Sequence, residues 1–301
     1  TLIEGGFGDG RGSYIFSARN SLLELVDKIV GLSSISLTAV PKYWDTQSKI
    51  VYDLTGSHKL IANFLYGESR INIEGDPKEK DEARKSMIDS SSVENVYPVT
   101  KQYAAGLTLR SLWGKDGYSL VTLYSSGTRT NVQVREDFAR RVRGPSGDVL
   151  AHSTLNSRRV FDNQSDESFL GAKADIVYQL HPQHEISAGL QVRTTQRWKN
   201  DAFVEADTSR FDLNRDGIFE TGPVVIPQYN YHQELGFANS SMYYMYASDK
   251  FKITPQLALT LGGRYDHFTY SGRGVFSPRA SISFQLVPQQ TTLTFATGLY
   301  P

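Results

Sequence analysis

The chain has 301 residues with a formal net charge of +0 and no cysteine, and its mean hydropathy is −0.37. No apolar run approaches the roughly 18 residues that a membrane helix needs, which excludes a helical membrane protein but not a β-barrel, whose strands alternate polar and apolar residues. The neutral charge gives no global attraction to nucleic acid, and the lack of cysteine excludes disulfides and thiolate metal sites.

Alternating residues near the N-terminus predict the first strands. In the stretch 12–19, Tyr14 and Phe16 alternate with serines and an arginine, as in a strand with one apolar and one polar face. A capping box at Ser21–Glu24 then predicts a short amphipathic helix. Two more strands follow across a tight turn, at residues 43–54 and 59–70.

The middle of the chain repeats strand pairs that are joined by short turns. The predicted strands lie at residues 100–112, 118–129, 169–180 and 185–198. Between the pairs lie polar segments, at residues 71–98, 130–167 and 199–237, and we expect these to be long loops.

The C-terminal part alternates most clearly. In the stretch 277–286, Ile282 and Phe284 alternate with Ser281 and Ser283. The last strands are predicted at residues 240–252, 257–270, 277–286 and 291–299, which makes eleven in all. Every connection at one end is a short turn, whereas four of the five at the other end are long. Strands of about 9–11 residues or more, with this asymmetry, predict an all-β fold, an antiparallel transmembrane β-barrel.

The residues also resemble a known family. The segment Tyr246–Asp266 (YASDKFKITPQLALTLGGRYD), followed by Ser277–Ala280, resembles the barrel of TonB-dependent outer-membrane receptors, and Phe16–Arg19 and Tyr52–Lys59 resemble its first hairpins. The resemblance implies a 22-stranded barrel with short periplasmic turns and long extracellular loops, an N-terminal plug and a TonB box. We find no plug, TonB box or closing strand, and therefore expect residues 1–301 to be a single barrel domain, a fragment of about 11 strands that forms half of the barrel.

The resemblance implies a receptor that captures a scarce nutrient and takes it up with energy from TonB, in the outer membrane of a Gram-negative-type bacterium. The nutrient can be a siderophore, cobalamin, a glycan or a peptide. The expected partners are outer-membrane lipid and lipopolysaccharide, TonB through the plug, and an extracellular small ligand, with no nucleic acid. Two alternatives stay open: a passive outer-membrane pore or adhesin barrel, and a soluble extracellular carbohydrate-binding β-domain whose apolar strand faces pack on a second sheet.

One polar segment contains a possible calcium loop. Its oxygen ligands follow the spacing of a Ca²⁺ loop, with side chains or a carbonyl from Asp212, Asn214, Asp216, Ile218 and Glu220. Position twelve, normally a bidentate glutamate, is Pro223, so the segment is not an EF-hand. The alternative is an Asx-turn with a glycine reversal. We expect no required cofactor beyond this possible Ca²⁺.

A second set of candidate residues shares the polar strand face, which would face the lumen of a barrel. It holds Arg19 and the candidate ligand-contacting residues Arg110, Lys173, Asp175, Arg193, Arg264, Asp266 and Arg279. The alternative is a solvated face or a ladder of cross-strand ion pairs. Tyr229 and Tyr231 can stack on a ligand or pack their own loop, and the basic cluster at residues 140–143 can bind lipopolysaccharide phosphate or simply be solvated.

Catalysis finds no support in the sequence. The six histidines are scattered, and the chain contains no HExxH, no GxSxG and no P-loop. We therefore expect a protein that is not an enzyme.

Overall fold

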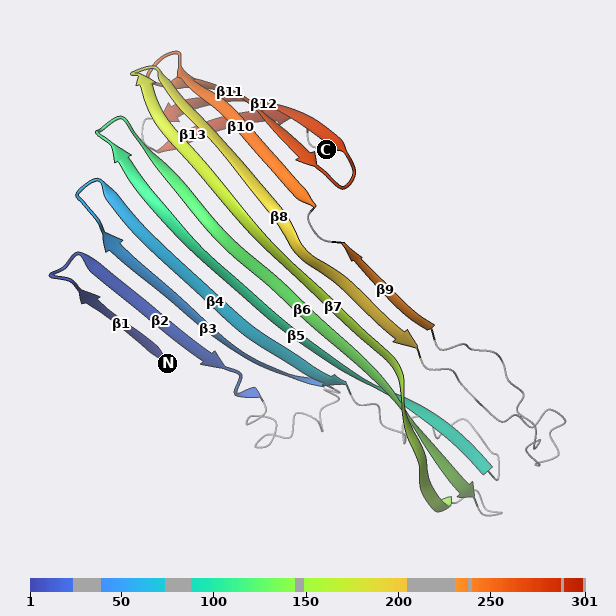
Figure 1. Ribbon diagram of the computed structural model, residues 1–301. Coiled ribbons are helices and arrows are strands. Elements are labelled where there is room, and N and C mark those ends of the chain that lie inside the picture. Colours follow the sequence, from blue (N-terminus) through green and yellow to red (C-terminus); the bar gives the residue numbers. More distant parts are fainter. Residues whose placement is uncertain are drawn as a thin grey trace.

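The computed structural model describes residues 1–23, 39–73, 88–143, 149–204, 231–237, 240–287 and 290–299, and these form one antiparallel sheet (Figure 1). At residues 39–40, 88–94, 136–143, 149–158, 204, 231–235 and 237 the structure describes the backbone only. The described residues form no second layer, so the apolar strand faces do not pack on another sheet as the soluble alternative requires. A search of the same residues finds no helix that is both long enough and apolar enough to cross a membrane.

The sheet has thirteen strands, twelve of which lie side by side in chain order. The bounds are β1 Leu2–Phe7, β2 Gly12–Asn20, β3 Ala39–Asp53, β4 His58–Ile73, β5 Ile88–Trp113, β6 Gly117–Arg143, β7 Val149–His181, β8 His184–Val204, β9 Tyr231–Phe237, β10 Ser241–Lys252, β11 Leu257–Phe268, β12 Arg273–Val287 and β13 Thr291–Gly298. Within the described chain, β1 and β13 stand at the two ends of this order and each pairs with one neighbour, and β9, outside the order, pairs with β8.

Strands β9 and β10 follow each other along the same side of β8. One part of β8 pairs with β10 and the part beyond it pairs with β9. At the junction the backbone N–H of Thr195 donates to the carbonyl of Ser240 (2.8 Å), and the Ser240 hydroxyl donates to Thr195 Oγ1 (3.1 Å). The two strands therefore act as one long strand with a break between Phe237 and Ser241.

The two ends of the sheet differ. Short turns join neighbouring strands at one end, at residues 8–11, 54–57, 114–116, 182–183 and 253–256. At the other end β5, β6 and β7 run for 26, 27 and 33 residues and project beyond β2, β3 and β4 (Figure 1). We call the projecting part the extension: residues 88–100 of β5, 130–143 of β6, 149–165 of β7, 200–204 of β8, and β9.

The eleven predicted strands are confirmed, and β1 and β9 are added to them. The prediction of long loops at residues 71–98, 130–167 and 199–237 was wrong for the parts that form the extension. The reason is that backbone pairing of neighbouring strands continues there, although the residues lack the apolar-outward alternation used to recognise a strand. The predicted helix after Ser21 lies almost wholly outside the described residues.

Pairing register divides the sheet into two faces, because directly paired residues point the same way. One row across six strands is apolar: Ala62, Leu107, Leu123, Ala172, Val192 and Tyr243. The next row points the other way and is mostly polar: Thr108, Thr122, Lys173, Gln191, Tyr244 and Asp266. The alternation read from the sequence is therefore confirmed strand by strand.

The apolar face is left uncovered in the described part of the chain. Leu190 is 60% exposed, Leu123 58% and Phe295 64%, and they belong to a continuous set that spans the sheet. Soluble monomers rarely expose contiguous apolar patches beyond a few hundred Å². We therefore expect this apolar face to contact an apolar environment rather than water.

Aromatic side chains border the apolar face in two rows. Near the short turns lie Tyr52, Trp113, Tyr178 and Phe251, and toward the other end lie Trp44, Tyr66, Tyr103, Tyr243 and Tyr265. Along β3 the two rows are separated by the eight residues from Trp44 to Tyr52, or about 26 Å at roughly 3.3 Å per residue. Tyr118 and Trp198 lie on the opposite face.

Candidate functional site

The polar face is concave. Hollows of about 370–580 Å³ open on it, and most of the side chains that line them belong to polar-face positions of β1 to β7 and β10 to β13. The sheet therefore curves around its polar face, which leaves the apolar face convex.

The predicted ligand-contacting residues of the strands all lie on this concave face. Register places them in neighbouring rows: Arg110, Lys173, Asp175, Arg193, Arg264, Asp266 and Arg279. They do not converge on one point, because they are spread over β5, β7, β8, β11 and β12. The Arg110 Nε atom is buried and has no hydrogen-bond partner among the described residues.

Several of these charges are paired along one strand. Lys173 Nζ lies 2.9 Å from Asp175 Oδ2, and Arg264 Nη2 lies 2.6 Å from Asp266 Oδ1. These partners are two residues apart and so point the same way. A cross-strand pair also occurs, where Arg19 Nη2 lies 3.0 Å from Asp45 Oδ1.

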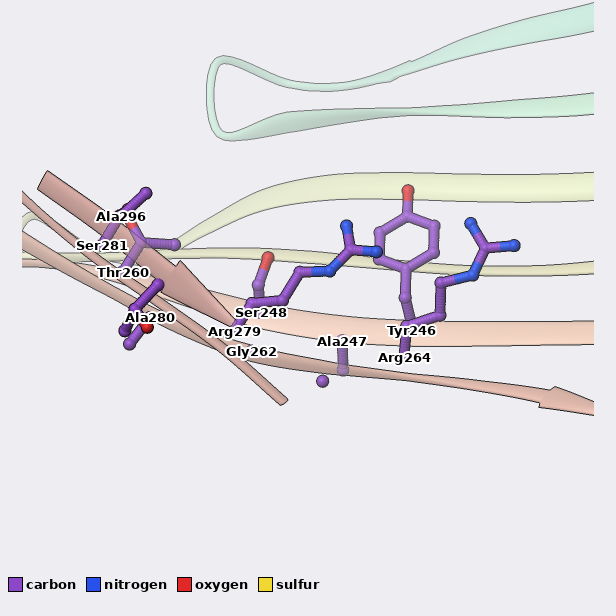
Figure 2. A pocket seen from close by; sticks show the side chains of 12 residues that line it. Tyr246, Ala247, Ser248, Thr260, Gly262, Arg264, Arg279, Ala280, Ser281 and Ala296 are labelled. Carbon is purple, nitrogen blue, oxygen red and sulfur yellow. The ribbon is translucent and has the colours of Figure 1, made fainter. Parts of the chain in front are cut away.

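A hollow of about 440 Å³ lies over β10 to β13. Figure 2 shows Tyr246, Arg264 and Arg279 projecting from the same side of the strands. The Arg264 guanidinium also lies over the Tyr244 ring, 5.0 Å from its centroid. Two guanidinium groups and a phenol line the hollow, and the guanidinium group of Arg264 is also paired with Asp266. Guanidinium groups suit anionic ligands.

Tyrosines on this face lie over glycines of the next strand. A Cβ at Gly189 would meet Tyr246 Cε1 at 2.4 Å, and a Cβ at Gly171 would meet Tyr124 Cζ at 2.3 Å. The phenol of Tyr246 donates to Asp175 Oδ1 (2.8 Å), and the amide of Gln191 donates to the phenol oxygen of Tyr124 (2.6 Å). The glycines thus leave room for the rings of these tyrosines.

A row of charges crosses the convex face just beyond the second aromatic row. Direct pairing joins Glu68, Lys101, Arg129, Asp166 and Lys199 on β4 to β8. Glu68 contacts Arg70 and Lys101, and Asp166 contacts Arg129 and Arg197. Glu68 lies beyond the strand segment that the two aromatic rows enclose. The hydrogen bond from the Arg70 guanidinium holds the pKa of the Glu68 carboxyl below its ordinary value.

Sequence reasoning missed this charged row. Its members stand far apart in the chain and become neighbours only through register. The polarity of the faces also changes beyond it: in the extension the concave face carries Val96, Pro98, Val132, Val134 and Phe161. The alternation of Asn131–Arg135 (NVQVR) is the sequence signal that would have revealed this part of β6.

Some predicted sites lie outside the described residues. The calcium loop from Asp212 to Glu220 and Tyr229 belong to this group, and Tyr231 is the first residue of β9 but its side chain is not described. Residues 140–143 lie on β6 rather than in a loop. Within the part of the chain that is described, no three His, Asp or Glu side chains group to hold a metal ion.

Comparison with known protein families gives one match. The model described as "TonB dependent receptor-like, beta-barrel" matches residues 43–299, which is most of the chain. A search of curated proteins by sequence found no match.

Solved structures with a similar fold include three receptors and transporters. The siderophore receptor PirA from Acinetobacter baumannii is 15% identical with a TM-score of 0.51, and 95% of this chain covers 38% of it. A mutant of the ferric enterobactin receptor PfeA from Pseudomonas aeruginosa is 16% identical with a TM-score of 0.54, and the match covers 98% of this chain and 40% of the receptor chain. The RagAB peptide transporter is 9% identical with a TM-score of 0.53, and the match covers 99% of this chain and 36% of the transporter chain. The chain thus spans about two fifths of the length of these structures.

Proposed function

Because the chain belongs to the family of TonB-dependent receptor-like β-barrels, we propose that it forms part of the wall of an outer-membrane receptor. The receptor captures a scarce nutrient outside the cell and takes it up with energy supplied through TonB. In this proposal the chain acts in transport and performs no catalysis.

One observation carries the proposal. The same strands present an exposed, convex apolar face bordered by aromatic rows and a concave polar face. This is the arrangement that a barrel wall needs, since one face meets acyl chains and the other meets water. The separation of the aromatic rows, about 20 Å once the strands tilt by roughly 40°, is close to the ~25 Å apolar band of such barrels.

The proposed ligand path follows the concave face from the extension toward the short turns. A ligand would first meet the apolar side chains Val132, Val134 and Phe161 and then the arginines and tyrosines around the hollow at Tyr246. A siderophore, cobalamin, a glycan and a peptide all remain candidates. The similar structures named for siderophores and for a peptide support this range without selecting one.

In the whole receptor, the concave face would also contact a plug domain through which TonB acts. The charged pairs on the face, such as Lys173 with Asp175, are suited to polar contacts with such a domain. The predicted calcium loop would lie in an extracellular connection, and titration calorimetry with millimolar Ca²⁺ tests it. Absence of binding heat in that titration would leave the Asx-turn as the better interpretation.

The 301 residues contain no cysteine, so in a full-length background without other cysteines two single substitutions test the two faces directly. Single cysteines at Ile282 and Ser281, which are adjacent but point to opposite faces, would be introduced into the full-length protein in bilayers. We expect Ile282→Cys to react with a bilayer-restricted reagent and Ser281→Cys with a water-soluble maleimide. Equal labelling of both by the water-soluble reagent would refute the barrel wall.

Energy coupling needs a second test. Uptake of candidate nutrients would be compared in cells with and without TonB, each expressing the full-length receptor. Loss of uptake without TonB is expected. Uptake that persists would favour a passive pore.

A further inference from the structure

We propose that the charged row on the convex face binds the phosphate groups of lipopolysaccharide in the outer leaflet. The surface consists of Arg70, Lys101, Arg129 and Arg197, held by Glu68 and Asp166. The inference rests on the proposed function, because it requires the convex face to meet lipid.

The first argument is position. On β5, Lys101 is the next residue on the convex face beyond Tyr103 of the aromatic row, in the direction away from the short turns. On β4, Glu68 has the same position relative to Tyr66. Aromatic rows of this kind mark the boundary between acyl chains and headgroups. The charged row therefore stands at headgroup height, at the end of the sheet that carries the extension (Figure 1).

The second argument is an excess of positive charge. Each of the two carboxylates is shared by two cations: Glu68 by Arg70 and Lys101, and Asp166 by Arg129 and Arg197. Four cations on two carboxylates leave two positive charges without compensation inside the row. Lys199, the remaining cation of the row, is paired with Asp201 (3.5 Å), and this neutral pair does not change the balance.

The third argument is the direction in which the charges are presented. The side chains of Glu68 and Asp166 are only 10% and 14% exposed, whereas those of Arg129 and Arg197 are 52% and 61% exposed. The carboxylates thus lie beneath the guanidinium groups and leave donors directed outward.

The fourth argument is spacing. Arg129 Nη2 lies 2.6 Å and Arg197 Nη1 3.3 Å from the same oxygen, Asp166 Oδ2. Two guanidinium groups that share one carboxylate oxygen are close enough for a single phosphate to receive hydrogen bonds from both. Arginine binds phosphate with bidentate geometry, which makes this pair a better phosphate site than two isolated lysines.

The proposal is tested on the full-length protein folded in detergent micelles, with fluorescent lipopolysaccharide and its dephosphorylated form as probes. We expect wild type to bind the phosphorylated form more tightly. The double variant Arg129→Gln/Arg197→Gln should bind it roughly 30-fold more weakly, since each cation near an anionic surface contributes about a factor of five. Equal binding of the two probes by wild type would overturn the proposal.

A matched control removes two positive charges elsewhere. Lys115 and Lys250 are exposed near the short-turn end, and Lys115→Gln/Lys250→Gln should bind the phosphorylated probe as wild type does. A loss equal to that of the arginine variant would show that net charge alone attracts the probe, and the specific surface would be rejected.

A third variant separates phosphate binding from a purely structural salt bridge. Asp166→Asn removes the carboxylate that competes for the two arginines, so it should bind the phosphorylated probe about five times more tightly. If the arginines serve only to hold the strands together, the same variant would bind no more tightly than wild type, which would contradict the proposal. This outcome does not depend on whether the arginine variant folds.

Failure of this inference is distinguishable from failure of the proposed function. Insertion into bilayers, measured by the cysteine labelling described above, is independent of lipid phosphate. A wild-type protein that inserts and shows no phosphate preference refutes the phosphate surface alone, whereas one that does not insert refutes the barrel wall as well.

Discussion

Strand β6 crosses two regions whose faces have opposite polarity. Below the charged row, that is, between the row and the short turns, its odd-numbered residues Val121 and Leu123 are apolar and exposed on the convex face. In the extension the even-numbered Val132 and Val134 are the apolar residues, and they lie on the concave face, while Gln133 and Arg135 take the convex positions. The pairing of β6 with β7 continues in register from Tyr118 to Val134. The polarity of the side chains on each face therefore changes along the strand, whereas the backbone pairing does not.

The comparison shows that strand pairing and facial polarity are separate properties. The ladder of backbone hydrogen bonds needs only neighbouring strands, whereas the choice of apolar face depends on what surrounds the sheet. A switch at the charged row is what a membrane boundary would produce: lipid on the convex side below it and water above it. Of the four variants that follow, the first tests this difference directly, and the others test the packing on one side of the row and the row itself.

The largest effect is expected for a charge on the convex face below the charged row. Leu123→Lys should destabilise the full-length protein by about 2–4 kcal/mol, because a lysine would enter the apolar band. Gln133→Lys is the control on the same strand and face, beside Asp162, and should change stability by no more than ~1 kcal/mol. Urea-dependent folding into lipid vesicles measures both, and equal effects would remove the boundary between the regions.

A second variant tests the close packing of the concave face below the row. Gly189→Val should cost about 1–3 kcal/mol, since its side chain would collide with Tyr246 and Asp175. Gly106→Val is the control, because a Cβ there has its nearest atom at 3.7 Å. Combining Gly189→Val with Tyr246→Ser should recover part of the loss. Strict additivity of the two costs would mean that the tyrosine does not occupy the space above the glycine.

A third variant removes one hydrogen bond from the same place. Tyr246→Phe should lower stability by about 1 kcal/mol, because it leaves Asp175 without the phenol donor. The control is Tyr265→Phe on the convex face, whose hydroxyl has no hydrogen bond in the described part of the chain, and its effect should be smaller. The same urea titration measures the difference, and a larger loss at Tyr265 would contradict the assigned roles.

The smallest effect is expected in the charged row itself. Arg129→Gln should change folding stability by less than about 1 kcal/mol, because exposed ion pairs contribute little to stability. The same substitution contributes to the loss of lipopolysaccharide binding proposed above, so the two measurements should diverge. A loss of several kcal/mol would show that the row holds the strands together rather than facing the membrane surface.

Much of the fold below the charged row could be predicted from the sequence. Period-two alternation located the strands there, and the short turns followed from turn residues between them. In the β5–β6 turn, Gly114 takes the left-handed conformation, with a φ of 62°. At Gly117 glycine is needed for a different reason, because a Cβ would lie 2.3 Å from the carbonyl oxygen of Val177.

The sequence by itself determined which residues of each crossing strand face which way, because side chains alternate along a strand whatever its neighbours are. Assignment of Arg264, Asp266 and Arg279 to the polar face followed from this alone. Only the tertiary structure decided which residues of different strands stand side by side, since register is set by the pairing of segments far apart in the chain. Asp166 thereby joins Arg129 to Arg197, and the extension forms from segments that are polar when read alone.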